Sequence, residues 1–450
     1  MRKGVGNLLV LCGAAVLAVT AVSCSSVLAL DPVVTSYRNA DFDKAYERLA
    51  LMEDEYLAKQ GPLLYALDAG MLSHYSGKWD DSNRHLDLAE RLIREHYTES
   101  LSANVSSYLI NDLERPYQGE DYEDIYANLF KSLNYVHQGE PESALVEVRR
   151  FAEKQQLLQD SYDRLFASVE AAGRNSAHIP LDARISIRFS SSALGNWLGM
   201  VVSRDIGEKE QARFFGEQVR MAFEKQRSLY PFGLPRTVDR DEARLGDGTC
   251  RVNVIAFTGL APVKEEVVDR FWIADNTYVK IALPRMVARP TRVASAEVLL
   301  GNGRSFLLEP IEDIGAIAME AFRLRRSYIE SKTVIRSVLK TTGTMFIDAA
   351  TGSMAANANS REEANRIEFY GALFSFASRI FSEASEQADV RISHFYPDRA
   401  WVGGIDLMPG VYEARVIYRD RSGSVIGEKR LGDVVVSPRR VNLWESVWPW

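Results

Sequence analysis

Cysteine is scarce in this chain: its 450 residues include three, Cys12, Cys24 and Cys250. Two of them lie in the N-terminal stretch MRKGVGNLLVLCGAAVLAVTAVSC, which joins Arg2 and Lys3 to an apolar run too short for a comfortable membrane span. This pattern predicts an export signal. If the signal is removed ahead of Cys24 and Cys24 is acylated, Cys250 is the only cysteine left with a thiol, which excludes an internal disulfide. We therefore expect hydrophobic cores alone to hold the fold.

The rest of the chain contains no apolar run of transmembrane length, and it lacks an excess of positive charge. Removing residues 1–23 takes away Arg2 and Lys3, so 54 basic against 61 acidic side chains become 52 against 61, a net charge of −9. A nucleic-acid partner is disfavoured by this balance.

Complete catalytic motifs are missing as well. The sequence contains no Gly-x-Ser-x-Gly, His-Glu-x-x-His or Cys-x-x-Cys. Gly70 and Gly77-Lys78 resemble a phosphate loop, but six residues separate the two glycines where the motif has four. We expect no catalysis, no metal and no cofactor.

The residues around Cys24 resemble a bacterial lipobox. Ala21-Val22-Ser23 precede the cysteine and Ser25-Ser26 follow it. Acylated Cys24 would anchor the protein to a membrane, with residues 24–38 as a tether, because two or more acyl chains bind a bilayer stably. An ordinary signal peptide cleaved elsewhere is the alternative.

Residues 39–235 show helical periodicity. Three stretches begin with a short turn and continue as amphipathic helices: Ala40 to Asp54, Gly77 to Leu92 and Gly139 to Lys154. Their helix-turn-helix spacing resembles the tetratricopeptide repeat, although Gly77 and Gly139 lie 62 residues apart where two repeats would differ by 34. A generic helical bundle is the alternative.

The pattern changes to strands after residue 235. Residues 236–395 predict a mixed α+β domain, and residues 396–450 a small β-sandwich-like module that ends in an aromatic tail. We expect Trp444, Trp448 and Trp450 in that tail to dock on a neighbouring domain. The predicted fold class is therefore α+β and multidomain, with an N-terminal tetratricopeptide-like array, a mixed region and the β module.

The stretch RPYQGEDYEDIYANLFKSLNYVHQGEP, Arg115 to Pro141, concentrates acids ahead of a helical pattern. The acids are Glu120, Asp121, Glu123 and Asp124. A metal or acid/base site would need them to converge on one point, whereas a helix start needs only carboxylates at its N-cap and first turn. We interpret them as the start of a helix.

Tyrosines in and near this stretch are the candidate binding residues. Tyr117, Tyr122, Tyr126 and Tyr135 could face a groove and contact a partner. A role in the hydrophobic core is the alternative.

Several blocks together resemble a family of uncharacterised bacterial envelope lipoproteins with tetratricopeptide-like helices. They are the lipobox at Cys24, RPYQGEDYEDIYANLFKSLNYVHQGEPESALVEVRR, TGLAPVKEE with KIALP, and ADVRISHFYPDRAWVGGIDLMPG. Lipoproteins similar to penicillin-binding-protein activators and to the curli-secretion channel family tend to accompany its members. The resemblance implies a role in envelope assembly and assigns no catalytic residue.

The expected function is a lipid-anchored scaffold or adaptor in the outer membrane, facing the periplasm. Its partners would be the membrane, through Cys24, and another envelope protein or peptide. Two alternatives stay open: an enzyme or regulator acting on peptidoglycan, with Glu120 and Asp124 as its acids, and an accessory subunit of an outer-membrane export system.

Overall fold

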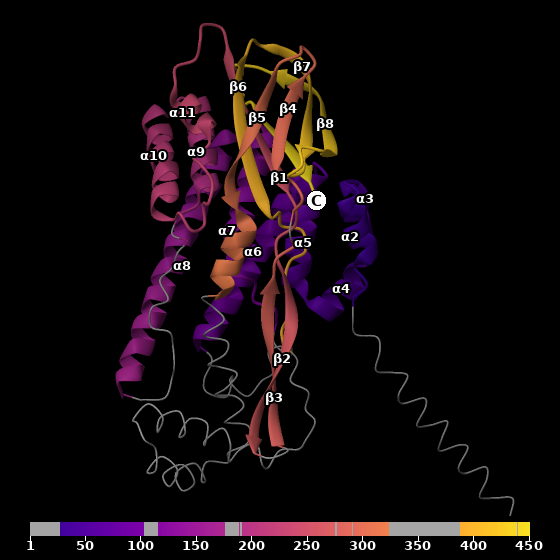
Figure 1. Ribbon diagram of the computed structural model, residues 1–450, viewed down its shortest axis with the longest axis vertical. Helices are drawn as coiled ribbons and strands as arrows, with labels where there is room; N and C mark the ends of the chain where they lie inside the picture. Colours follow the sequence, from indigo (N-terminus) through magenta and orange to yellow (C-terminus); the bar gives the residue numbers. More distant parts are fainter. Residues whose placement is uncertain are drawn as a thin grey trace, which may run out of the picture.

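The computed structural model describes residues 28–102, 116–175, 189, 191–274, 277–289, 291–323, 388–438 and 440–450. The fold is mixed α/β, with helices in the N-terminal part and a seven-stranded sheet built from the rest (Figure 1). The coarse form of the fold prediction is therefore confirmed. Within the described residues no helix is both long and apolar enough to cross a bilayer. Cys24 lies outside the part of the chain that the structure describes.

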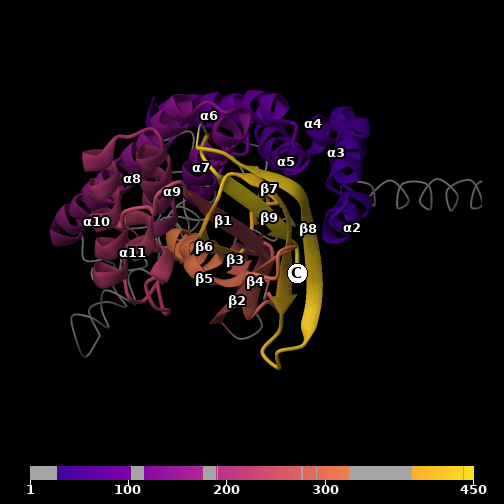
Figure 2. The same ribbon diagram turned by 90° about the horizontal axis from the view of Figure 1, so that it is seen from above.

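The helices follow one another as hairpins. Their bounds are α2 Asp31–Arg38, α3 Phe42–Leu51, α4 Glu53–Gln60, α5 Pro62–Tyr75, α6 Trp79–Ser102, α7 Asp121–Gln138, α8 Pro141–Asn175, α9 Ala193–Asp205, α10 Lys209–Lys225 and α11 Arg236–Glu242. The pairs α5/α6, α7/α8 and α9/α10 pack closely, and α6 packs on α7 and α8 on α9. Viewed from above, α2 to α11 form an arc around one side of the sheet (Figure 2).

Glycine makes the turn of each of these three hairpins. Gly77, Gly139 and Gly207 have φ angles of 69°, 78° and 88°, in the left-handed region that glycine adopts without strain. At Gly139 the amides of Gly139 and Glu140 bond to the carbonyls of Val136 and Tyr135, which satisfies the last turn of α7. The predicted turns at Gly77 and Gly139 are thus confirmed, and the turn at Gly207 repeats them.

The seven strands form one sheet in the order β8-β7-β4-β5-β6-β1-β9. Their bounds are β1 Cys250–Thr258, β4 Ser295–Leu300, β5 Ser305–Asp313, β6 Arg399–Leu407, β7 Gly410–Arg419, β8 Val425–Val436 and β9 Leu443–Trp448. Neighbours are antiparallel except β1 and β9, which run parallel. A separate two-stranded ribbon, β2 Val263–Ala274 and β3 Thr277–Val287, extends from the body (Figure 1).

The strand pairing corrects the prediction of a C-terminal β-sandwich-like module. Residues 396–450 supply four strands to this single sheet, and β6 lies between β5 and β1. The sheet therefore crosses the expected boundary at residue 395. Period-two alternation identifies each strand, but it does not say which distant strand pairs with it.

Two hydrophobic cores lie on opposite faces of the sheet. On β1, Val252 and Val254 belong to the core enclosed by the curled sheet, whereas Ile255 and Phe257 pack with the helices. Every residue of β1 is buried, as expected for a strand covered on both faces.

The N-terminal helix belongs to the folded body, contrary to the predicted tether. Leu28 is 6% exposed, and Val33 and Tyr37 of α2 are fully buried. Residues 28–38 are therefore not a linker, because their apolar side chains pack in the core shared by the helices. The C-terminal tail docks there too: Trp450 Nε1 donates to the Arg38 carbonyl at 2.8 Å. The predicted docking therefore holds for Trp450 alone, because Trp444 and Trp448 lie on β9 and pack in the sheet's own core.

Candidate partner-binding groove

The inner side of the helical arc is occupied by the protein's own chain. The segment 388–398, which leads into β6, contacts α5 through Asp68. This fully buried carboxylate accepts hydrogen bonds from Ser393 Oγ at 2.7 Å, His394 N at 2.8 Å, His394 Nδ1 at 2.7 Å and Tyr56 OH at 2.7 Å. Four donors satisfy both oxygens of Asp68, so we interpret it as the residue that holds the segment in place.

A second buried carboxylate, Glu123 of α7, holds the same segment. Glu123 accepts from Ser393 N at 2.6 Å, from Tyr117 OH at 2.7 Å and from Glu120 N at 2.8 Å. Burial, and then the neighbouring Glu120 carboxylate, raises the pKa of Glu123 to about 7. Tyr75 OH adds a bond to the Phe395 carbonyl at 3.0 Å. The face that a helical array usually offers to a ligand is therefore filled internally at α5 and α7.

The acids Glu120 to Asp124 begin a helix, as predicted. Glu120 is the N-cap of α7 and forms a capping box with Glu123 at the third helical position. Glu120 is 5% exposed and pairs with Lys264, while Asp124 pairs with Lys154 at 2.6 Å. The two acids named for a glycan-acting site are thus each neutralised by a different lysine.

The four candidate tyrosines divide into three buried members and one that is half-buried. Tyr117, Tyr122 and Tyr126 are 3%, 1% and 0% exposed, so their core alternative is correct and they cannot touch a partner. Their rings pack where α7 meets the sheet and the segment 388–398, which the spacing of the tyrosines alone could not reveal. Tyr135, one turn before the end of α7, is only partly buried and lines an open groove.

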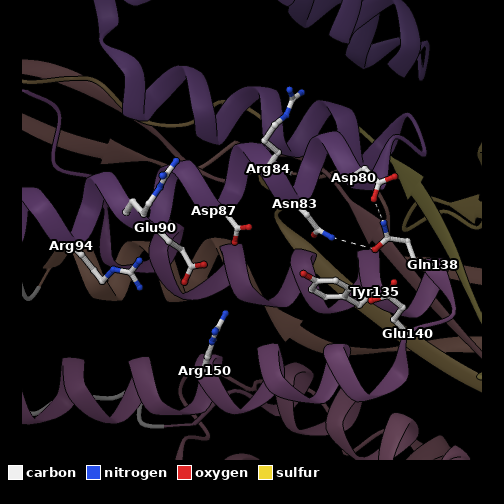
Figure 3. A pocket seen from close by; sticks show the side chains of 11 residues that line it. Asp80, Asn83, Arg84, Asp87, Glu90, Arg94, Tyr135, Gln138, Glu140 and Arg150 are labelled. Carbon is white, nitrogen blue, oxygen red and sulfur yellow. Dashed lines mark hydrogen bonds between the residues drawn. The ribbon is translucent and has the colours of Figure 1, made fainter.

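This outer groove lies between α6 and α8, with α7 as its floor, and has a volume of about 710 Å³. Figure 3 shows charged side chains of both signs along its walls. Its arginines are Arg84, Arg91, Arg94 and Arg150. Its carboxylates are Asp80, Asp87, Glu90 and Glu140.

Lys131 lies under the floor of the outer groove, with 1% of its side chain exposed. Its Nζ lies 2.6 Å from Asp87 Oδ1, 2.6 Å from Glu90 Oε2 and 3.2 Å from Glu147 Oε2. Burial alone would lower the pKa of Lys131, but Glu90 and the other carboxylates outweigh it and raise that pKa above its ordinary value. Lys131 therefore stays charged and joins α7 to both walls.

Lys154 of α8 adds two more ion pairs to this network, one with α6 and one with α7. Its Nζ contacts Glu90 Oε1 at 2.8 Å and Asp124 Oδ1 at 2.6 Å. Burial would raise the pKa of Glu90, but Lys154 and then Lys131 lower it to about 2. The three helices are thus fixed by ion pairs whose rupture would leave buried charges without partners.

The rim of the outer groove is accessible. The side chains of Arg84 and Arg150 are 67% and 53% exposed, and their ion pairs with Asp81 and Glu147 each join residues on one helix. The Arg84–Asp81 pair is exposed on both sides and therefore weak, so Arg84 can exchange it for a ligand's carboxylate. Glu147, the partner of Arg150, is buried and also lies 3.2 Å from Lys131 Nζ, so it keeps a cation if Arg150 turns to a ligand. Tyr135 adds an aromatic ring with a polar tip beside Gln138 and Glu140 (Figure 3).

The outer groove therefore has a floor tied together by the ion pairs of Lys131 and Lys154, and arginines on its rim. Among the residues that the structure describes, no group of three or more His, Cys, Asp or Glu side chains could hold a metal ion.

Sequence reasoning singled out Tyr135 but missed the ion network under it. The available signal was Lys131 at an apolar position of α7, since a charged residue on a buried face needs partners.

Comparison of the chain with family models, with curated proteins and with solved structures gives no match. The functional conclusion accordingly depends on the geometry of the outer groove and on the sequence around Cys24.

Proposed function

We propose that this protein is a lipid-anchored scaffold of the bacterial cell envelope that binds a segment of another envelope protein in its outer groove. The observation that carries the proposal is the preformed groove over Lys131. Its walls are held by buried ion pairs, so binding need not organise them, and this reduces the entropic cost of association.

The helices support this role as a degenerate tetratricopeptide-like array. The pairs α5/α6, α7/α8 and α9/α10 each turn at a glycine with positive φ, and small residues let paired helices approach closely. At Gly70 an added Cβ would lie 2.6 Å from Leu86 Cδ2. Because the segment 388–398 fills the inner face at α5 and α7, the partner uses the outer face.

The chemistry of the outer groove favours an acidic peptide segment as the ligand. A cavity of about 710 Å³ has the size of ordinary ligand sites and takes a few side chains of a peptide. Arginine binds carboxylates through two parallel hydrogen bonds, and the exposed Arg84 and Arg150 stand on opposite walls. The groove carboxylates Glu90 and Asp87 are already paired with lysine, so they repel an acidic ligand less than their number suggests. A scaffold of this kind requires no catalytic group.

Charge reversal on the rim tests the proposal. The mature protein is crosslinked in its native envelope and captured by affinity, as wild type and as the double variant Arg84→Glu, Arg150→Glu. The matched control is Arg415→Glu, Arg430→Glu, two arginines of β7 and β8 whose side chains are 47% and 81% exposed.

A partner recovered with wild type and with the control should fall at least about tenfold with the groove variant, because each charge-assisted hydrogen bond contributes about 1.5–3 kcal/mol. Equal recovery from all three proteins would contradict a site in the outer groove. Anchoring is tested separately by mass spectrometry of the N-terminal peptide, where Cys24→Ala should abolish the acyl mass.

A further inference from the structure

The folded body begins very close to the predicted anchor. Ser25, Ser26 and Val27 alone separate Cys24 from Leu28, which is 6% exposed and packed in the core. Four residue steps span at most about 14 Å, at 3.3–3.6 Å per residue. An acyl group on Cys24 would therefore hold the surface around Leu28 against the bilayer.

The start of α2 lies beside the end of α3. Arg48 of α3 donates from Nη1 to the Pro32 carbonyl in the first turn of α2, at 2.8 Å. Leu51 is the last residue of α3, about one turn beyond Arg48, so it lies at the same end of the hairpin as residues 28–30. Figure 1 shows this end of α2 and α3 next to α4.

Five apolar residues belong to this end of the hairpin, which we call the anchor corner: Ala29, Leu30, Pro32, Leu51 and Met52. Leu51 is 88% exposed, the highest fraction among the exposed large apolar side chains of the described residues. Ala29 and Pro32 are also exposed, and Leu30 and Met52 are half-buried. One exposed leucine is ordinary on a soluble surface, but this one lies where a membrane-bound residue must leave the fold.

We propose that the anchor corner contacts the bilayer surface and that Leu51 inserts into it when Cys24 is acylated. This inference rests on the anchoring part of the proposed function. Tethering supplies the corner with a high effective concentration of lipid, so a small apolar surface suffices for contact. The acidic first turn of α4, Glu53 to Glu55, follows directly, so the expected surface is zwitterionic lipid.

This contact would fix the orientation of the helical arc relative to the membrane. Helices α2 to α4 form one end of the arc and α10 and α11 the other (Figure 2). With α2 to α4 on the membrane, the outer groove between α6 and α8 lies farther along the arc, away from the bound end. The partner then meets this groove at a defined distance from the lipid.

A fluorescent probe at position 51 tests the inference on the full acylated protein. Leu51→Cys is introduced into a Cys250→Ala background, labelled with an environment-sensitive dye and reconstituted into phosphatidylcholine vesicles that carry a lipid-bound quencher. The matched control is Val411→Cys, at a side chain that is 64% exposed on β7. A Cys24→Ser form of each labelled protein, added to the same vesicles, provides the unanchored reference.

We expect a blue shift at position 51 and quenching at least about threefold stronger than at position 411, with neither effect in the Cys24→Ser form. Equal quenching at both positions of a protein shown to be acylated would overturn the membrane contact and leave the scaffold proposal standing. Absence of acyl mass on Cys24 would overturn both the anchor and this inference. Circular dichroism of each labelled protein excludes misfolding as the cause of a negative result.

Discussion

The helical arc and the sheet are joined by a buried ion cluster whose disruption has a calculable effect. Glu445 of β9 accepts from His74 Nε2 at 2.9 Å and from His137 Nε2 at 2.8 Å. His74 Nδ1 lies 2.6 Å from Asn134 Oδ1, and the Asn134 amide nitrogen already donates to Ser82 and Asn83. Both ring nitrogens of His74 thus face acceptors, so the ring carries both protons and a positive charge.

The pKa shifts of this pair agree with that assignment. Burial lowers the pKa of His74, but the Glu445 carboxylate outweighs burial and raises it above the ordinary value. Burial would raise the pKa of Glu445, but His74 and His137 lower it well below its usual range. A buried pair of this kind costs about 3–5 kcal/mol when one partner is removed.

We predict that Glu445→Gln lowers the free energy of unfolding by about 3 kcal/mol at pH 6, the low end of that range because His74 can lose its proton. The assay is urea unfolding followed by tryptophan fluorescence, with a lower midpoint and an unchanged slope.

The sign of the pH dependence follows from the raised pKa of His74. The folded state holds a proton that the unfolded state releases near pH 6.5, so the contribution of His74 is complete below that pH. It is lost as pH rises through the pKa of folded His74, so the gap between wild type and Glu445→Gln should shrink. Because the pKa of Glu445 is lowered, its contribution is lost only as pH falls through that lowered value. A gap under about 1 kcal/mol at pH 6, or one that does not shrink as pH rises, would refute the assignment.

Three further substitutions give separate tests. Lys131→Met leaves Asp87, Glu90 and Glu147 without their shared cation and should cost about 3 kcal/mol in urea unfolding, whereas a loss within about 0.5 kcal/mol would show that the floor is not fixed by charge. Gly139→Ala forces a side chain into φ 78° and should cost about 1 kcal/mol, and an unchanged melting temperature would contradict the turn. Asp68→Asn should free the segment 388–398, seen as faster proteolysis there, and an unchanged cleavage pattern would contradict its role as a clamp.

Local patterns in the sequence predicted the local structure well. The start of α7 at Glu120 was predictable because acids satisfy the free amides of a first turn, and Gly77 and Gly139 were predictable as turns. Of the tail's tryptophans only Trp450 docks on α2 as predicted, whereas Trp444 and Trp448 belong to β9 and the core of the sheet.

Long-range structure was not predictable, because it depends on partners that a local pattern does not name. β1 pairs with β6, more than a hundred residues later, and this placed residues 396–450 inside one sheet. The burial of Tyr117 depends on Ser393 and its neighbours in the segment 388–398, which share Glu123 with it. The ion pairs of Lys131 were not predictable for the same reason, because their carboxylates come from two other helices.

The central claim is that a partner binds in the outer groove, and site-specific crosslinking tests it most directly. A photoreactive amino acid replaces Arg91, an exposed residue of the groove rim, in the anchored protein, and Arg415 on β7 in a matched control. We predict a reproducible crosslinked partner from position 91 that disappears with Arg84→Glu and Arg150→Glu and is not formed from position 415. The same product from both positions, or a product from position 91 that survives both charge reversals, would contradict the account.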